Sequence, residues 1–236
     1  MNILGVGAHP DDLEIGCGGT LAKYAKLGHK VFMCHISNGN MGHALIMPDE
    51  LIGIRKRESV EAAKKLGAEE VSVDIGTGDI EVDAANQSLI KNVVEIIRWT
   101  KPDVIITHNP DDYMQDHMEA SRLAYNASFA SSLVHYATKT QSFGNIPSVF
   151  YMDTLAGVNF VPTEYVDISD TIELKLEALS CHESQVKWML DHDHIDFVDF
   201  VRTCSKYRGL QCGVPYAEGF RQYSGWPRFR TVRLLP

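Results

Sequence analysis

Two short segments of the chain carry side chains that are suited to metal or acid–base chemistry. Residues 5–20, GVGAHPDDLEIGCGGT, leave an apolar stretch and then place a histidine and two adjacent carboxylates before a glycine-rich run. A bare turn needs proline and glycine, but it does not need the histidine and both carboxylates. Residues 107–117, THNPDDYMQDH, repeat this composition after another apolar stretch. Together the segments offer His9, Asp11, Asp12, His108, Asp111, Asp112, Asp116 and His117.

Such a set of side chains predicts a catalytic metal site. Two histidines and one carboxylate bind a zinc-type ion and leave one coordination position open. Water bound there loses a proton near neutral pH and becomes a nucleophile. We assign His9 and Asp12 to the metal, because their i, i+3 spacing across a turn brings both side chains to one point. The adjacent Asp11 then remains as a base.

Two other interpretations apply to the first segment. An aspartate pair before a helix is often an N-cap, because a carboxylate there satisfies free N–H groups and the helix dipole. Capping by itself does not explain two such segments. A dinucleotide-binding loop would need G-x-G-x-x-G directly after the strand, and Pro10 occupies the place of the third glycine. The sequence therefore disfavours a nicotinamide-dependent dehydrogenase.

Alternating patterns along the chain predict an α/β protein. We expect strands at residues 2–8, 30–37, 70–75, 102–108 and 148–153, and helices at 18–28, 49–67, 84–100, 170–182 and 194–207. Asp49 is a candidate cap, and Gly28 and Gly67 are candidate helix stops. This rhythm implies a Rossmann-like three-layer fold with helices on both faces of a mostly parallel sheet, whose strand order begins 3-2-1-4. The tail after residue 212 is too irregular to assign.

The expected strand order brings the two segments together. In an open parallel sheet, ligands bind beyond the carboxyl ends of the strands, where the strand order reverses. One segment follows the first strand and the other follows the fourth. Because these strands are neighbours in the 3-2-1-4 order, both segments face the same crevice.

Composition narrows the class of protein. A formal charge of −9 over 236 residues argues against nucleic-acid binding, which needs clustered Lys and Arg. No run of residues is apolar enough for a membrane span, and the start of the sequence lacks a charged leader, so we expect a cytoplasmic protein. The five cysteines are scattered and odd in number, so we expect reduced, mostly buried thiols.

Taken in order, the motifs resemble the LmbE-like, or PIG-L, family of zinc-dependent N-deacetylases. They are AHPDD after the first strand, R-x-x-E at Arg55 and Glu58, LG at the end of that helix, the pair Gly78-Asp79, and DH after the fourth strand. RGLQCGVPYAEGF in the tail is similar to the closing segment of one bacterial branch. The resemblance implies one LmbE-like domain over residues 1–236. Its Rossmann-like core, residues 1–130, would hold the metal, and residues 131–236 would complete the pocket.

The resemblance also implies roles for individual residues. His9, Asp12 and His117 are implied as zinc ligands and Asp11 as the general base, with Fe²⁺ as an alternative ion because such a site accepts both metals. The implied reaction hydrolyses the N-acetyl amide of a small amino sugar or glycoconjugate and releases acetate. Because family members often assemble, a homo-oligomer is among the implied partners. The implied substrate-binding residues are Arg55, Asp79, Asp116 and Tyr113.

One position departs from the family pattern. Well-studied members carry His-Pro-Asp-His after the fourth strand, and their first histidine stabilises the tetrahedral intermediate and serves as general acid. This chain has Met114 there, and methionine donates no proton. The acid role then passes to Asp11, or to His108, His182 or His194, each of which has a structural alternative as a loop cap or a solvated helix end. Two rival functions stay open, namely hydrolysis of another amide such as a thiol conjugate, and binding without turnover.

Overall fold

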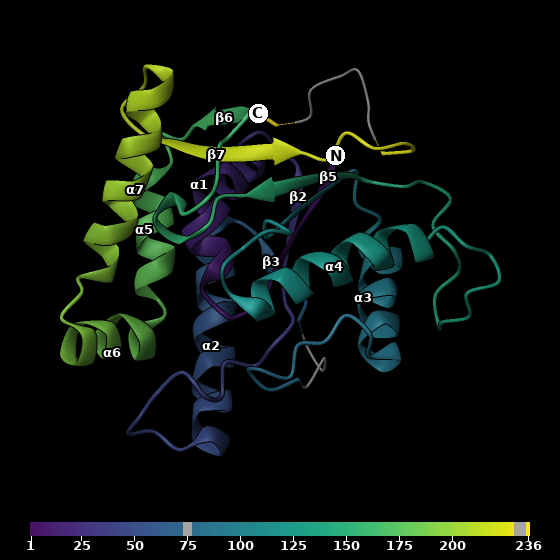
Figure 1. The fold of residues 1–236 in the computed structure, drawn as a ribbon, viewed down its shortest axis with the longest axis horizontal. Helices are drawn as coiled ribbons and strands as arrows, with labels where there is room; N and C mark the ends of the chain where they lie inside the picture. The colour runs from purple at the N-terminus through teal and green to yellow at the C-terminus, as the bar shows by residue number, and fades with distance from the viewer. Residues whose placement is uncertain (73–76, 229–234) are drawn as a thin grey trace.

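The computed structural model describes residues 1–72, 77–228 and 235–236 (Figure 1). A sheet of seven strands has the order β3-β2-β1-β4-β5-β7-β6, which confirms the expected 3-2-1-4 start. The neighbouring strands are parallel except for β7, which is antiparallel to β5 and β6. The strands are β1 Asn2–Gly7, β2 Lys30–His35, β3 Glu69–Glu70, β4 Val104–Thr107, β5 Ser148–Met152, β6 Glu164–Asp167 and β7 Ala217–Gln222.

Helices cover both faces of this sheet, as β1 illustrates. Ile3 belongs to an apolar cluster with α1, α2, α5 and α7, whereas Leu4 belongs to a second cluster with α3 and α4. Figure 1 shows these two groups of helices on opposite sides of the strands. The α/β three-layer prediction is therefore confirmed. The helices are α1 Asp12–Lys26, α2 Pro48–Leu66, α3 Gln87–Thr100, α4 Gln115–Ala130, α5 Ile172–Ser180, α6 Glu183–Asp193 and α7 Phe197–Cys212, with a 3-10 turn, η1, at Leu155–Gly157.

The first helix begins earlier than its sequence pattern predicts. It starts at Asp12 rather than at residue 18, and so includes three glycines. Two of these glycines are required by packing. A Cβ on Gly16 would lie 2.6 Å from Met152 Sδ, and one on Gly19 would lie 2.8 Å from Ile168. Tight packing therefore overrides the low helix propensity of glycine and brings Asp12 into the first turn.

The other predicted boundaries were right in part. Gly67 ends α2 in the left-handed conformation, as expected, but the cap position of α2 is Met47 and Pro48 is its first residue, so the Asp49 cap prediction was wrong. The strand expected at 70–75 is described only as β3, and residues 73–76 lie outside the described part of the chain.

The tail of the chain forms a strand that its composition hides. β7 contains Glu218, a charged residue that is buried. Its carboxylate accepts hydrogen bonds from the backbone N–H groups of Gly19 and Thr20, at 2.9 and 2.8 Å, and lies 2.6 Å from Lys175 Nζ. Because these partners come from α1 and α5, no local pattern reveals why the carboxylate is buried.

Two further expectations concern the burial of the cysteines and the absence of a membrane span. All five cysteines are free thiols, but only Cys17 and Cys34 are buried, so the expectation of mostly buried cysteines was wrong. Cys212 is exposed. Among the described residues, no helix combines the length and the apolar character that crossing a membrane requires.

Candidate metal centre

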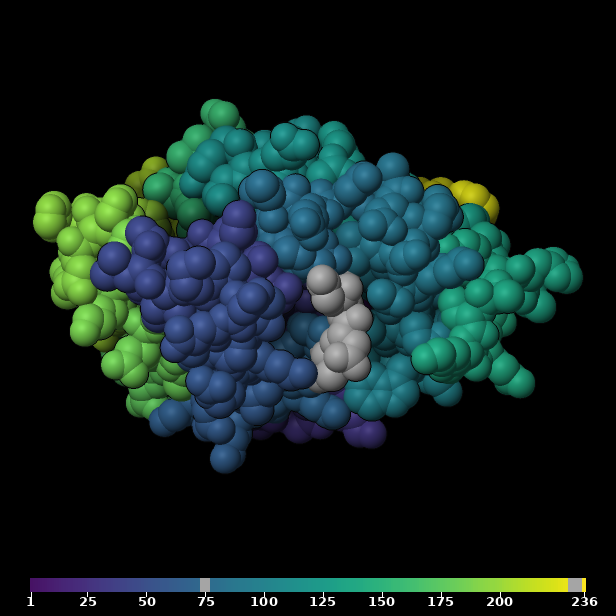
Figure 2. Space-filling model, turned by 90° about the horizontal axis from the view of Figure 1, so that it is seen from below, coloured from purple at the N-terminus to yellow at the C-terminus, as the bar shows by residue number. Residues whose placement is uncertain are grey.

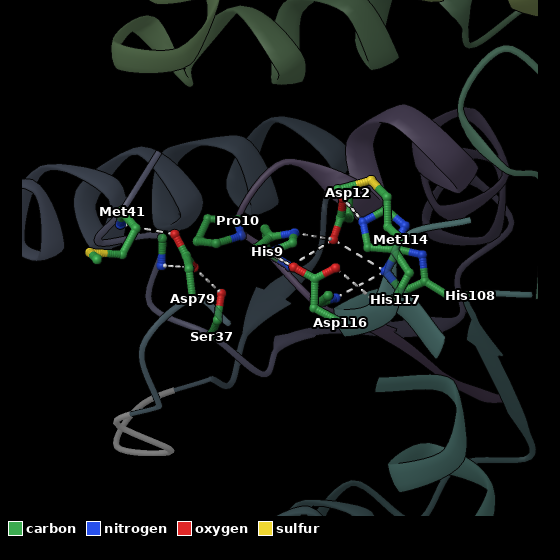
Figure 3. A network of polar contacts seen from close by, with 12 residues as sticks. His9, Pro10, Asp12, Ser37, Met41, Asp79, His108, Met114, Asp116 and His117 are labelled. Carbon is green, nitrogen blue, oxygen red and sulfur yellow. Dashed lines mark hydrogen bonds and ion pairs between the residues drawn. The ribbon is translucent and has the colours of Figure 1, made fainter. Parts of the chain in front are cut away.

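The two His/Asp-rich segments meet at one point beyond β1 and β4. These strands are parallel neighbours in which Val6 pairs with Thr107, so the segments that follow them emerge side by side. His9 Nδ1 lies 3.4 Å from Asp12 Oδ2, and His117 Nε2 lies 3.3 Å from Asp12 Oδ1. One donor atom from each of the three residues lies within 4.8 Å of the other two (Figure 3). The structure thus brings His9, Asp12 and His117 together.

Local structure fixes the Asp12 carboxylate between the histidines. The backbone N–H of His9 donates to Asp12 Oδ2 at 2.6 Å, which closes the turn around Pro10. His108 Nε2 accepts from the backbone N–H of Ala8 at 2.9 Å and lies 3.1 Å from the same Asp12 oxygen. Burial raises the pKa of Asp12, but the charge of His117 opposes burial, and this pKa lies well below its usual value.

His9 and His117 each face Asp12 with one ring nitrogen and a second carboxylate with the other. His9 Nε2 lies 2.6 Å from Asp116 Oδ2, and His117 Nδ1 lies 3.3 Å from Asp112 Oδ2. Burial lowers the pKa of His9, but the hydrogen bonds to Asp116 and Asp12 raise it to about 11. Burial and the neighbouring carboxylates oppose each other in the same way at His117, whose pKa is raised to about 10.

Asp11 lies beside this cluster with its own charged partner. It occupies the residue before α1 in the left-handed conformation, with φ of 114°, and its side chain makes no capping hydrogen bond. The N-cap interpretation of this aspartate is therefore wrong. Only 8% of Asp11 is exposed. Arg55 Nη2 lies 3.1 Å from Asp11 Oδ2 and also donates to the carbonyl oxygen of Pro10. Burial raises the pKa of Asp11, and the charge of Arg55 opposes that shift.

The predicted substrate-binding residues lie in different environments. Asp79 accepts hydrogen bonds from the Ser37 hydroxyl at 2.6 Å and from the backbone N–H groups of Gly39 and Met41 at 3.1 and 3.0 Å. It thereby fixes the loop after β2, and Gly39, with φ of 73°, packs against the Arg55 side chain. Figure 2 shows that the surface is hollowed between the region of α2 and the region of α3. Tyr113 is 53% exposed.

The remaining histidines divide into buried and exposed positions. His194 ends α6 and is exposed, as its structural interpretation expects. His182 is fully buried, and its Nε2 lies 3.0 Å from Glu14 Oε1, so the interpretation of His182 as solvated was wrong. His35 Nδ1 in turn lies 3.2 Å from Glu70 Oε2. Sequence reasoning missed this buried group, although His35 ends β2 at the same edge of the sheet.

Comparisons with known proteins show the family of the chain. A family model described as PIG-L, GlcNAc-PI de-N-acetylase, matches residues 4–128. The chain is 29% identical to the diacetylchitobiose deacetylase of Thermococcus kodakarensis, over 94% of this chain and 83% of that protein. It is 26% identical to the 1D-myo-inositol 2-acetamido-2-deoxy-alpha-D-glucopyranoside deacetylase of Rhodococcus jostii, over 78% of this chain and 81% of that protein.

Solved structures show the same fold. The N,N'-diacetylchitobiose deacetylase of Pyrococcus horikoshii matches with a TM-score of 0.79 and 27% identity, over 94% of this chain and 83% of that one. A 4-carboxy-2-hydroxymuconate hydratase of Pseudomonas putida matches with a TM-score of 0.82 and 22% identity, over 99% and 100% of the two chains, and at this identity shows the fold alone. Because the family model covers more than half of its length, the chain belongs to the PIG-L family of GlcNAc-PI de-N-acetylase-like proteins.

Proposed function

We propose that this chain hydrolyses the N-acetyl amide of an amino sugar or glycoconjugate with the help of a bound divalent metal ion. The convergence of His9, Asp12 and His117, with Asp11 beside them, carries this proposal. Membership of the PIG-L family and the two deacetylases among its relatives support the substrate class.

The residues of the cluster fit such an ion. His117 Nε2 is buried and makes no hydrogen bond within the described residues, although it lies 3.3 Å from Asp12 Oδ1. An ion between these two atoms would satisfy both. Two imidazole nitrogens and one carboxylate oxygen are ligands that Zn²⁺ prefers in catalytic sites, and Fe²⁺ accepts the same set. When bound, the ion supplies Lewis acidity toward the acetyl carbonyl and acidifies a water molecule.

Asp11 moves the proton in this proposal. Its carboxylate accepts a proton from water while the water oxygen forms a bond to the acetyl carbon. Asp11 then returns this proton to the nitrogen as the carbon–nitrogen bond breaks, which gives acetate and a free amine. Burial favours the protonated state of Asp11 after the first step, and the nearby charge of Arg55 favours the ionised state before it.

Met114 explains why one residue takes both proton-transfer roles. It directly precedes α4, and its backbone N–H donates to Asp112 Oδ1 at 3.0 Å (Figure 3). Its thioether has no proton to donate. His108 does not replace it, because its Nε2 already accepts the backbone N–H of Ala8. Asp11 is therefore the proposed general acid as well as the general base.

The substrate-binding proposals follow from the surroundings of the cluster. Arg55 is buried, and its Nη2 faces Asp11 and the carbonyl oxygen of Pro10, so we propose that it acts on the sugar through Asp11. Asp79 is proposed to act through the loop that it fixes, since three donors of the chain already reach its carboxylate. Asp116 and Tyr113 precede His117 in sequence and are proposed to face the sugar.

The experiment is an assay of amine release from N-acetylglucosamine, N,N'-diacetylchitobiose and inositol-linked N-acetylglucosamine. The proposal expects release from at least one sugar, loss after chelation and recovery after Zn²⁺ is added back. A thiol-conjugated amide in the same panel tests the rival hydrolysis. Binding of a sugar without any amine release would instead support the rival in which Met114 marks a protein without turnover.

A further inference from the structure

Asp112 is a buried carboxylate with two fixed oxygens. Only 5% of the residue is exposed. Its Oδ1 accepts the backbone N–H of Met114 at 3.0 Å, and its Oδ2 lies 3.3 Å from His117 Nδ1. Its own backbone N–H donates to the carbonyl oxygen of Asn109 at 3.1 Å. Oδ1 therefore faces a backbone donor and Oδ2 faces an imidazole nitrogen, so neither oxygen is free for a substrate.

We propose that Asp112 is a positioning residue that holds the Nδ1 proton of His117 and so presents Nε2 to the metal without a proton. The proposal rests on the proposed function, since it takes His117 as a ligand. An ionised carboxylate only accepts hydrogen bonds, so the imidazole nitrogen that faces it carries the proton. Carboxylates behind metal-binding histidines typically contribute about 10- to 100-fold in metal affinity.

A separate ion between His108, Asp112 and His117 is the competing interpretation, because their donor atoms also lie within 4.8 Å of one another. The contacts argue against it. His108 Nε2 faces the backbone N–H of Ala8 and the Asp12 carboxylate, and Asp112 Oδ1 accepts the backbone N–H of Met114. We therefore expect one ion per chain.

Asp112→Asn removes the charge of the side chain and changes the expected His117 tautomer, while it keeps the shape of the side chain. An Asn side chain has one oxygen, whereas Met114 N–H and His117 Nδ1–H both need an acceptor. If the oxygen keeps the Met114 contact, the Asn NH₂ group faces His117 Nδ1 and drives the ring proton to Nε2. That tautomer does not bind a metal through Nε2. The neighbouring Asp111 is exposed and provides the matched control.

The experiment measures the Kd for Zn²⁺ by competition with a chromophoric chelator, in the parent chain, Asp112→Asn, Asp111→Asn and His117→Ala. We expect Asp112→Asn to weaken binding about 10- to 100-fold, Asp111→Asn to match the parent, and each chain to bind one ion. ¹⁵N NMR of the Zn²⁺-loaded parent should show the His117 proton on Nδ1. Thermal unfolding of the metal-free variants checks that the fold persists.

Three results would overturn the inference. An Asp112→Asn affinity within about twofold of the parent, beside a strong loss in His117→Ala, would refute the role of Asp112 and leave the proposed function intact. Parent-like affinity in His117→Ala would show that the ligand set itself is wrong, and both proposals would fall. Two ions per chain, with Asp112→Asn losing one of them, would assign Asp112 to a second site instead.

Discussion

Arg55 and Asp11 form a buried ion pair in which Nη2 lies 3.1 Å from Oδ2, and the same guanidinium donates to the carbonyl oxygen of Pro10. The pair joins α2 to the turn that precedes α1, 44 residues earlier in the chain. It places a fixed positive charge beside the proposed base. The charge state of Asp11 thus depends on a residue outside the His-Pro-Asp-Asp segment.

Arg55→Gln should move the acid limb of the pH–rate profile to higher pH. Without the cation, burial of Asp11 is no longer opposed, so its pKa rises and more of the base is protonated at a given pH. The measurement is kcat/KM against pH, with Arg57→Gln as an exposed control on the same helix. An unchanged acid limb in Arg55→Gln would show that this ion pair does not set the ionisation of the base.

Asp11→Asn should retain the bound metal and lose most turnover. General base catalysis contributes about 10²- to 10⁴-fold, and an amide cannot accept the proton from water. Amine release and metal content are measured on the same preparation. Full activity in this variant would remove Asp11 from the mechanism, whereas loss of the metal would make it a ligand.

Zn²⁺ affinity should rise steeply with pH. In the metal-free protein the pKa values of His9 and His117 are raised to about 11 and about 10, so both rings carry protons at neutral pH. Each must lose a proton to bind the ion, so about two protons should be released per ion between pH 6 and 9. Calorimetry in buffers of different ionisation enthalpy counts these protons, and binding without proton release would contradict the raised values.

The same shifts predict the pH dependence of metal-free stability. The folded-state pKa of each histidine lies above its ordinary value of 6.5, so the stabilising contribution of the ring is full below about pH 6.5 and is lost as pH rises toward 10 and 11. Asp12 has the opposite pH dependence. Because its pKa is lowered in the folded protein, its contribution to stability is full above its ordinary pKa and is lost as the pH falls. Thermal unfolding of the metal-free protein from pH 7 to 10 should show a falling Tm, and the parent minus His9→Gln difference isolates one ring.

Met114→His should increase kcat by up to about 10²-fold, because it supplies a proton donor where this chain has a thioether. Met114→Leu is the matched control for size. Steady-state kinetics on the sugar with the highest turnover provides the comparison. Equal kcat in the two variants would indicate that proton donation from this position does not limit the reaction.

Glu218→Ala should destabilise the fold by about 3–5 kcal/mol, since it leaves the buried Lys175 ammonium without its partner. Glu177→Ala, which breaks an exposed pair with Lys65, should cost at most about 1 kcal/mol. Denaturant unfolding of both variants measures the difference. Similar small losses would show that the Lys175–Glu218 pair contributes little.

Part of the site could be predicted from the spacing of residues in the sequence. His9 and Asp12 are separated by one turn, and the strand order brings the second segment opposite them, but only the family resemblance selected His117 within that segment. The buried pairs beside the cluster do not follow from such patterns. Glu14 and His182 lie 168 residues apart, and the contact depends on how α5 and α6 pack against α1.

Packing also decides which element boundaries the pattern misses. The pattern predicts the first helix only from residue 18, because glycine has a low propensity for helix, yet Gly16 lies inside α1 where a Cβ would clash with Met152. Asp112 was recognised as one of eight polar residues, but its partner was not predicted. Only the fold of residues 109–117 shows that it faces His117 rather than the metal position.

The location of the ion tests the central claim most directly. Crystals of the protein grown with Zn²⁺, measured with X-rays on both sides of the zinc absorption edge, should give one anomalous peak per chain. We predict that it lies about 2.0–2.2 Å from a ring nitrogen of His9, a carboxylate oxygen of Asp12 and Nε2 of His117. A peak at other residues, or none in a crystal of protein that deacetylates a sugar, would contradict the account.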